Sequence, residues 1–374
     1  ILAMSNGWKS DLVPLMQRIS QIATGAGSLF VFAAGSRLAL ALPADRRAAR
    51  IVADLYQPQR WRGRLFHRIA KWMITFGIPA VRPTHPRTDG LIPEVAWLKE
   101  AALQGSIGFL GCNPSHGYRC ILAGVDPNSG EKFVAKLGLD EGATSVRREH
   151  AMLVQLHGKY PGVLKSLGCE TGDGWSLLRL PHLGDAGPKR IGQRGVAELL
   201  HSWIGTQRVP LAEIAWAKRL LEQARRNGAP AAWCSKLLAR PINQALIHGD
   251  FAVWNTRRPQ NTIYQEKVDS KESLVALDWE WSEEHGVAGV DLAHGLRQES
   301  YMVYRMKPAK AVAWMLAQAA SPRWSPYLEA CGWKDSYEDW LRLGLLHSHF
   351  NAKNESANLL KELSLNVTHE IYTK

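Results

Sequence analysis

Apolar and polar positions alternate in short runs through the middle of the chain, and they predict a small antiparallel sheet. The runs with the period of a strand cover residues 107–111, 118–125, 132–137, 163–167 and 175–180. The clearest turn between them is Asp126-Pro127-Asn128-Ser129-Gly130, which is made of residues that reverse a strand. A helix capped by Thr144 or Ser145 and reaching His157 interrupts the strands. We therefore expect five strands and one inserted helix over residues 96–183.

Two regions of different composition flank this predicted sheet. Residues 1–95 contain an apolar hairpin, a basic helical stretch and a Pro-rich passage over 79–93 that is typical of a linker. Residues 184–374 are mostly helical in pattern and rich in tryptophan, apart from short strands between 245 and 280. The expected fold is α+β and bilobal, with a small antiparallel-sheet lobe, a larger helical lobe and an N-terminal extension.

Two apolar strands of the third region each lead into an acidic side chain. Residues 245–247 lead into His248-Gly249-Asp250, and Asn255 follows the aspartate after four intervening residues. Residues 273–277 lead into Asp278. Because both apolar runs end in an acidic group, we expect the two carboxylates to meet at one rim.

Such an arrangement suits phosphoryl transfer. A carboxylate and an amide oxygen, here Asp278 and Asn255, suit Mg²⁺, which keeps several waters and bridges the phosphates. A second carboxylate that holds no metal, here Asp250, can accept the proton of the attacking hydroxyl.

These motifs resemble the aminoglycoside phosphotransferase and choline kinase superfamily, whose fold is protein-kinase-like. His248-Gly249-Asp250 with Asn255 is similar to the catalytic loop of that superfamily, a relative of the protein-kinase His-Arg-Asp loop. Asp278-Trp279-Glu280 resembles its metal-binding segment, and Asp291 resembles the aspartate that braces the loop. The resemblance implies an ATP- and Mg²⁺-dependent O-phosphotransferase with a catalytic loop of Asp250 and His248, where His248 orients the loop rather than carrying a proton.

The resemblance extends upstream to the predicted nucleotide site between the lobes. Lys136 resembles the strand lysine that contacts the α- and β-phosphates, and Glu149 resembles its ion-pair partner. Each of the two, taken alone, is more typical of a solvated surface charge. Gly111 and Gly117 bound the expected phosphate loop, which lacks the Gly-x-Gly-x-x-Gly pattern of protein kinases. Leu180 lies in the segment that resembles the hinge, under which the adenine is expected.

The charge of the chain bears on its partners. The net charge is +12, and residues 44–72 alone carry seven arginines and one lysine against two aspartates. This segment also holds apolar residues, so it is either a basic helix docked on the small lobe or an amphipathic helix on an anionic membrane surface. The sequence contains no recognised nucleic-acid motif, and nucleic acid is not an expected partner.

Composition also indicates which class of acceptor to expect. A cationic acceptor such as an aminoglycoside or choline calls for an acidic pocket. The C-terminal half has no obvious acidic cluster beyond Glu280, Glu283 and Glu284. A small hydroxyl acceptor such as a neutral or anionic sugar, an envelope-glycan or a lipid-linked intermediate fits better. The other class that remains open is a non-catalytic pseudokinase scaffold, although a scaffold has no need of a base and metal ligands.

We expect the protein in the cytoplasm, with peripheral association at the inner membrane surface as the alternative. The apolar stretch over residues 28–42 is interrupted by Arg37 and is too short to span a bilayer or to make a convincing secretory signal. The five cysteines are scattered without metal-binding spacing, which is typical of reduced thiols.

Overall fold

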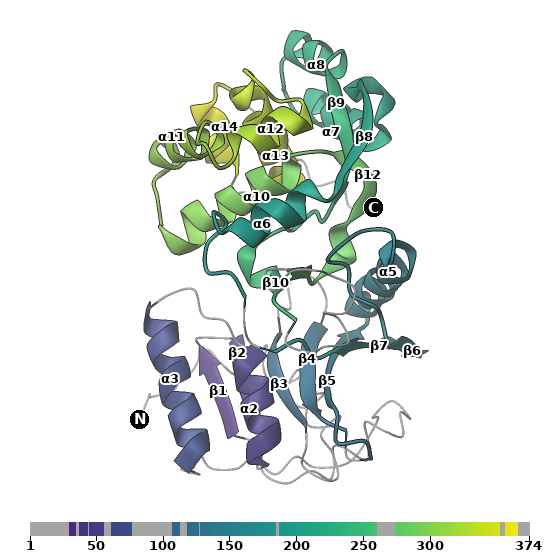
Figure 1. The fold of residues 1–374 in the computed structure, drawn as a ribbon, viewed down its shortest axis with the longest axis vertical. Helices are drawn as coiled ribbons and strands as arrows, with labels where there is room; N and C mark the ends of the chain where they lie inside the picture. Colours follow the sequence, from purple (N-terminus) through teal and green to yellow (C-terminus); the bar gives the residue numbers. More distant parts are fainter. Residues whose placement is uncertain are drawn as a thin grey trace. The chain divides into compact units, whose positions relative to one another are not determined.

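The computed structural model of this chain describes residues 30–34, 37–43, 45–55, 61–76, 107–112, 118–126, 128–184, 187–259, 274–351 and 356–365. It contains two compact units (Figure 1). Unit 1 is made of Ile1–Gln155 and Leu164–Asp185, and unit 2 of Leu156–Val163 and Ala186–Lys374. Each unit is described by itself.

Unit 1 is built on an antiparallel sheet in the order β1-β2-β3-β4-β5-β7-β6. Its strands are β1 (Phe30–Ala34), β2 (Arg37–Leu42), β3 (Ile107–Cys112), β4 (Tyr118–Val125), β5 (Lys132–Leu139), β6 (Gly168–Gly172) and β7 (Trp175–Pro181). The sheet has seven strands rather than the five expected, because the hairpin of the N-terminal extension joins it. β2 pairs with β3 through Leu40↔Leu110 and Ala41↔Phe109.

The strand expected over residues 163–167 is wrong. The edge strand is instead β6, which pairs with β7 from Gly168↔Arg179 to Gly172↔Trp175. Val163 makes an isolated bridge to Ala276 and belongs to unit 2. Val163 and Leu164 are buried outside a strand and Leu167 is exposed, whereas the polar β6 is a strand because its neighbour β7 offers an edge.

The helices of unit 1 within its described residues are α2 (Arg46–Leu55), α3 (Trp61–Phe76) and α5 (Glu141–Leu156). The basic stretch expected as one helix is thus two helices, α2 and α3. The residues of α2 that are buried in the core beside Leu42, Ala123 and Val125 are Ala49, Ile51, Val52 and Ala53. Helix α5 begins at Glu141, one turn before the expected caps, directly after Asp140, whose φ is 54°.

In its described residues, unit 2 is mainly helical around two small sheets. Its strands are β8 (Ile204–Pro210), β9 (Pro241–Ile247) and β12 (Glu283–Val287), in the order β12-β9-β8, and the pair β10 (Thr256–Arg257) and β11 (Val275–Ala276). Its helices are α6 (Arg194–His201), α7 (Ala215–Arg226), α8 (Ala231–Leu238), α10 (Val290–Gln298), α11 (Pro308–Ala319), α12 (Ser325–Cys331), α13 (Tyr337–Asn351) and α14 (Ala357–Glu362). The α+β class, with a small antiparallel sheet and a larger helical part, is confirmed.

Tryptophan side chains fill the core of unit 2 and fix the start of α10. Trp333 and Trp340 are fully buried, and their indole N–H groups donate to the carbonyls of Ala288 and Gly289 at 2.8 Å. Those two carbonyls directly precede α10. The tryptophans therefore hold in place the helix on which part of the candidate site is built.

Two further expectations concern the environment of the chain. Within the described ranges, none of the helices has the length and apolar character needed to cross a bilayer. Among the described residues, Cys169, Cys234 and Cys331 are free thiols, as the scattered spacing indicates.

Candidate active site

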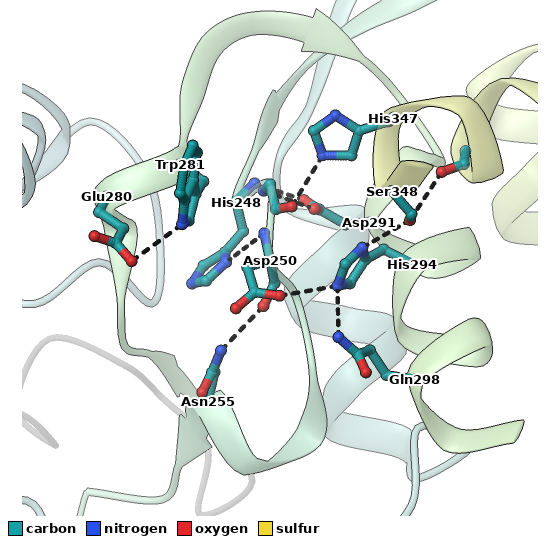
Figure 2. A network of polar contacts seen from close by, with 12 residues as sticks. His248, Asp250, Asn255, Glu280, Trp281, Asp291, His294, Gln298, His347 and Ser348 are labelled. Atoms are coloured by element: carbon teal, nitrogen blue, oxygen red, sulfur yellow. Dashed lines mark hydrogen bonds and ion pairs between the residues drawn. The ribbon is translucent and has the colours of Figure 1, made fainter. Parts of the chain in front are cut away.

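The catalytic loop begins where the buried strand β9 ends. Gly249 has a φ of 84°, in the region that favours glycine, and a Cβ at this position would lie 2.3 Å from the carbonyl oxygen of Trp281. The His-Gly-Asp sequence thus needs its central glycine both for the turn and for the close approach of the segment that follows Asp278. Figure 2 shows the polar contacts that surround this turn.

The backbone of the loop is held by Asp291 on helix α10. The N–H groups of His248 and Gly249 donate to the two carboxylate oxygens of Asp291 at 2.7 and 3.0 Å. Burial raises the pKa of Asp291, while the two backbone hydrogen bonds favour its charged form. Both carboxyl oxygens of Asp291 thus hold the backbone of the loop. The geometry suits the bracing role that the family resemblance implies.

The His248 ring joins the loop to the second acidic segment. His248 is completely buried, and its Nε2 lies 2.6 Å from the carbonyl oxygen of Leu277. A carbonyl can only accept, so Nε2 carries the proton in this contact. The ring is also close to Trp279, with ring centroids 4.8 Å apart. His248 therefore orients the loop, and its proton is engaged in that structural bond.

The Asp250 side chain is fixed by a residue that the sequence analysis did not identify. His294 Nε2 lies 2.9 Å from Asp250 Oδ1 (Figure 2). The Asp250 side chain is 38% exposed, whereas that of His294 is 3% exposed. Burial acts to raise the pKa of Asp250, but the hydrogen bond from His294 acts to lower it, and the pKa lies below its ordinary value. Asp250 is therefore a carboxylate at neutral pH, with one oxygen anchored.

A polar network continues behind His294. His294 Nδ1 lies 2.9 Å from the Ser348 hydroxyl, and the amide of Gln298 lies 3.2 Å from Nε2. Burial lowers the pKa of His294, so the ring is neutral at neutral pH. On the same helix as Ser348, His347 has its pKa lowered to about 4 by burial, and its Nε2 contacts the Gly249 carbonyl at 2.9 Å. Helices α10 and α13 together thus hold the loop from behind.

Asn255 and Asp278 are brought side by side by the two-residue ladder of β10 and β11. Thr256 pairs with Ala276 in this ladder, so Asn255 lies opposite Leu277, and the Leu277 N–H donates to the Asn255 carbonyl at 2.7 Å. Asp278 is the next residue along. The sequence analysis predicted that these two segments meet, and the described structure brings them to the same end of one ladder.

The side-chain contact of Asn255 and the backbone conformation of Asp278 are compatible with metal ligands. Asn255 Nδ2 donates to the Asp250 carbonyl at 3.0 Å, which leaves the amide oxygen to face a ligand. Asp278 has a left-handed backbone, with φ 74° and ψ 57°, a conformation that costs about 1–2 kcal/mol for most residues and that Asn and Asp tolerate better than most other residues with a side chain. Its neighbour Glu280 is buried, and one of its oxygens accepts the indole N–H of Trp281 at 3.0 Å.

The donor set fits Mg²⁺ better than a metal that needs a full protein cage. Among the described residues, no group of three or more His, Cys, Asp and Glu side chains could hold a metal ion. Mg²⁺ binds through one or two carboxylate or amide oxygens and takes its other ligands from water and phosphates. Asn255 and Asp278 supply that number of oxygens.

In unit 1, the predicted lysine and glutamate meet. Lys136 lies on β5, and its Nζ is 2.7 Å from both carboxylate oxygens of Glu149 on α5. The side chains of Lys136 and Glu149 are 15% and 3% exposed. This pair is therefore a buried ion pair and not two solvated surface charges.

The structure describes fewer contacts for the other residues that were predicted to bind the nucleotide. Leu180 is buried in β7 opposite Val134. Gly111 lies inside strand β3, and Gly117 lies outside the described residues. The roles of Gly111, Gly117 and Leu180 stay predictions.

Sequence reasoning missed His294, Gln298 and the α13 pair of His347 and Ser348. Asp291, His294 and Gln298 are spaced three and four residues apart, so they lie on one face of α10. A signal was present, because polar residues at this spacing in an otherwise apolar helix need buried partners. The sequence could not say which partner lies opposite.

Comparisons with known proteins give only structural similarity. No family model and no curated protein matches the sequence. Among solved structures, a protein proposed to be a fructosamine-3-kinase from Haemophilus somnus 129PT is 13% identical, with a TM-score of 0.37, covering 68% of this chain and 89% of its own. A thermostable mutant of the aminoglycoside phosphotransferase APH(4)-Ia, in a ternary complex with AMP-PNP and hygromycin B, is 11% identical, with a TM-score of 0.40, covering 72% and 95%.

A third similar structure is the aminoglycoside phosphotransferase APH(3'')-Id from Streptomyces rimosus ATCC10970, which is 12% identical, with a TM-score of 0.37, covering 66% of this chain and 90% of its own. At these identities and TM-scores, the similarities carry no weight beside the geometry of the site.

Proposed function

We propose that this protein is an ATP- and Mg²⁺-dependent phosphotransferase that moves the γ-phosphoryl group to a hydroxyl of a small, non-protein acceptor. The observation that carries the proposal is the arrangement in unit 2. A carboxylate, Asp250, is anchored on one oxygen by His294. It lies on the same loop as Asn255, which the β10–β11 ladder sets beside Asp278. A base and two metal ligands are what this reaction requires of a protein.

In this proposal Asp250 is the general base. Oδ1 is bonded to His294, and Oδ2 accepts the proton of the acceptor hydroxyl. The hydroxyl oxygen then bonds to the γ-phosphorus as the bond to the β–γ bridging oxygen breaks, and ADP leaves with that electron pair. The lowered pKa of Asp250 keeps the base in its charged form at neutral pH.

Asn255 and Asp278 would hold Mg²⁺, which neutralises charge on the phosphates when it is bound. The bond from Asn255 Nδ2 to the Asp250 carbonyl fixes the orientation of the amide. It therefore couples the position of a metal ligand to that of the base.

Unit 1 supplies the nucleotide contacts in this proposal. Glu149 holds the Lys136 ammonium in one orientation, in which Lys136 would contact the α- and β-phosphates. The buried Leu180 and its neighbours over residues 178–183 would contact the adenine.

A neutral or anionic acceptor, such as a sugar or a lipid-linked glycan, suits the site better than a cation. Glu280 is buried and bonded to Trp281. Glu283 lies 3.4 Å from Arg219, and Glu284 lies 3.4 Å from Lys159. The negative charges of Glu283 and Glu284, which could attract a cationic acceptor, are thus already partly neutralised by Arg219 and Lys159.

The proposal is tested by measuring ADP release from Mg²⁺-ATP across a panel of sugars, amino alcohols and lipid-linked glycans. We expect release that depends on both Mg²⁺ and one acceptor class, and that is lost in Asp250→Asn. The pseudokinase alternative predicts the opposite result: the protein binds nucleotide, no acceptor raises ADP release, and Asp250→Asn behaves as the wild type.

A further inference from the structure

Helix α3 exposes a continuous apolar stripe that phosphoryl transfer does not use. Its members are Trp61, Leu65, Ile69, Trp72 and Phe76, and they are between 48% and 65% exposed. At 3.6 residues per turn, the spacing of these five positions places them within an arc of about 80° on one side of the helix. Large apolar side chains rarely gather in this way on the free surface of a soluble protein.

The stripe is not the face by which α3 packs on its own unit. On the opposite side, Ala70 is buried and Ile74 packs against the core. His67 Nε2 contacts the Ala53 carbonyl at 2.8 Å, and Lys71 forms an ion pair with Asp54. These contacts join α3 to α2. Helix α3 therefore packs on unit 1 through one side, and its apolar stripe lies exposed on the other side.

The charges around the stripe are all basic on this helix. The sequence of α3 contains no Asp or Glu. Arg64 and Arg68 are exposed, and the helical spacing places them along one edge of the stripe. Three further arginines, Arg46, Arg47 and Arg50, are exposed on the neighbouring helix α2.

We propose that α3 is a membrane-docking helix, whose stripe inserts into the interface of an anionic lipid bilayer while Arg64 and Arg68 contact the headgroup phosphates. Tryptophan at such a depth keeps its ring in the apolar region and its N–H near the headgroups. A basic rim matches an anionic surface, with a gain of affinity for each arginine near it. The inference goes beyond the proposed phosphotransfer and does not rest on it.

The proposal assigns membrane docking to helix α3 alone and not to the whole segment of residues 44–72. The apolar side of α2 is buried in the core of unit 1, so α2 is the buttress that the sequence left open as one alternative. Phe66 is half-buried on the inner side of α3, so it does not belong to the inserting set. Phe76, four residues beyond Trp72, does belong to it.

The test is co-sedimentation of the full chain with vesicles of phosphatidylcholine alone and with vesicles in which about 30 mol% is phosphatidylglycerol. We expect pelleting with the anionic vesicles only, weakening steeply as salt is raised. Leu65→Ser with Ile69→Ser and Trp72→Ser should remain in the supernatant. These side chains are exposed, so the variant should keep its fold and its unfolding temperature.

A matched control removes exposed apolar groups elsewhere in unit 1. Val154 on α5 and Leu167 are 62% and 49% exposed, and Val154→Ser with Leu167→Ser should pellet as the wild type does. Asp250→Asn should also pellet normally, which separates failure of docking from failure of catalysis. The proposal is overturned if the wild type ignores anionic vesicles, if the stripe variant pellets equally, or if the stripe variant instead turns a dimer into a monomer.

Discussion

His294 Nε2 lies 2.9 Å from Asp250 Oδ1, so a buried imidazole on α10 holds one oxygen of the proposed base. Three residues earlier on the same helix, Asp291 holds the backbone of His248 and Gly249. One face of α10 therefore fixes both the main chain of the catalytic loop and the side chain that would do the chemistry. Helix α10 thus positions the loop together with the contacts within the loop, such as that of Asn255 Nδ2 with the Asp250 carbonyl.

Replacing the imidazole should shift the pH dependence of transfer. The hydrogen bond from His294 lowers the pKa of Asp250, so in His294→Ala this pKa should rise. A larger fraction of Asp250 is then protonated at a given pH, and the acid limb of the kcat profile moves to higher pH. Loss of a hydrogen bond to a charged group should also lower kcat by roughly tenfold on the plateau.

The control for this variant is His285→Ala, because His285 is exposed on β12. We expect its pH profile to match the wild type. A purely structural role for His294 would lower stability and leave the acid limb where it is. An unmoved acid limb in His294→Ala would contradict the positioning role.

The core of the site could be predicted from sequence because its parts are local. Asp250 and Asn255 are five residues apart, and the strand that ends before Asp278 is readable as an apolar run. The pairing of Lys136 with Glu149 also follows from order along the chain. His294 could not be assigned, because its partner lies 44 residues away and the pairing depends on how α10 packs.

The same holds for the fold: strands with a local sequence pattern could be predicted, and strands that form only by pairing with a distant segment could not. The strands over residues 118–125 and 132–137 follow from alternation and a Pro-Asn-Ser-Gly turn. β6 was missed because Gly168, Glu170 and Thr171 have no apolar pattern and form a strand through pairing with β7 alone. The addition of β1 and β2 to the sheet depends on β3, more than sixty residues away, and no local signal encodes it.

Removing the carboxylate of Asp278 should weaken metal dependence and activity together. Asp278→Asn preserves the size of the side chain and tolerates the left-handed backbone, but it removes the negative charge that would bind Mg²⁺. We expect the Mg²⁺ concentration for half-maximal rate to rise by about tenfold or more. Titration of Mg²⁺ against ADP release measures it.

Glu280→Gln is the matched control for the metal site. Glu280 is two residues further along, buried and bonded to Trp281. Its metal requirement should equal that of the wild type. If Glu280→Gln raises the requirement and Asp278→Asn does not, the metal ligand is Glu280.

Lys136→Met should raise the KM for ATP, because the ammonium that would contact the phosphates is gone. It should also lower the free energy of unfolding, by about 3 kcal/mol, since the buried Glu149 carboxylate loses its partner. Lys132→Met, at the exposed start of the same strand, should change neither quantity. An unchanged KM for ATP in Lys136→Met would remove Lys136 from the nucleotide site.

The central claim is that Asp250 acts on the acceptor hydroxyl and not on the nucleotide. Single-turnover transfer by Asp250→Asn, with the acceptor that the panel identifies, measures this directly when ATP affinity is measured beside it. We expect the rate to fall by ~10²- to 10⁴-fold with an unchanged Kd for Mg²⁺-ATP. A variant that retains most of its transfer rate, or one whose loss of rate is matched by a loss of ATP affinity, would contradict the account.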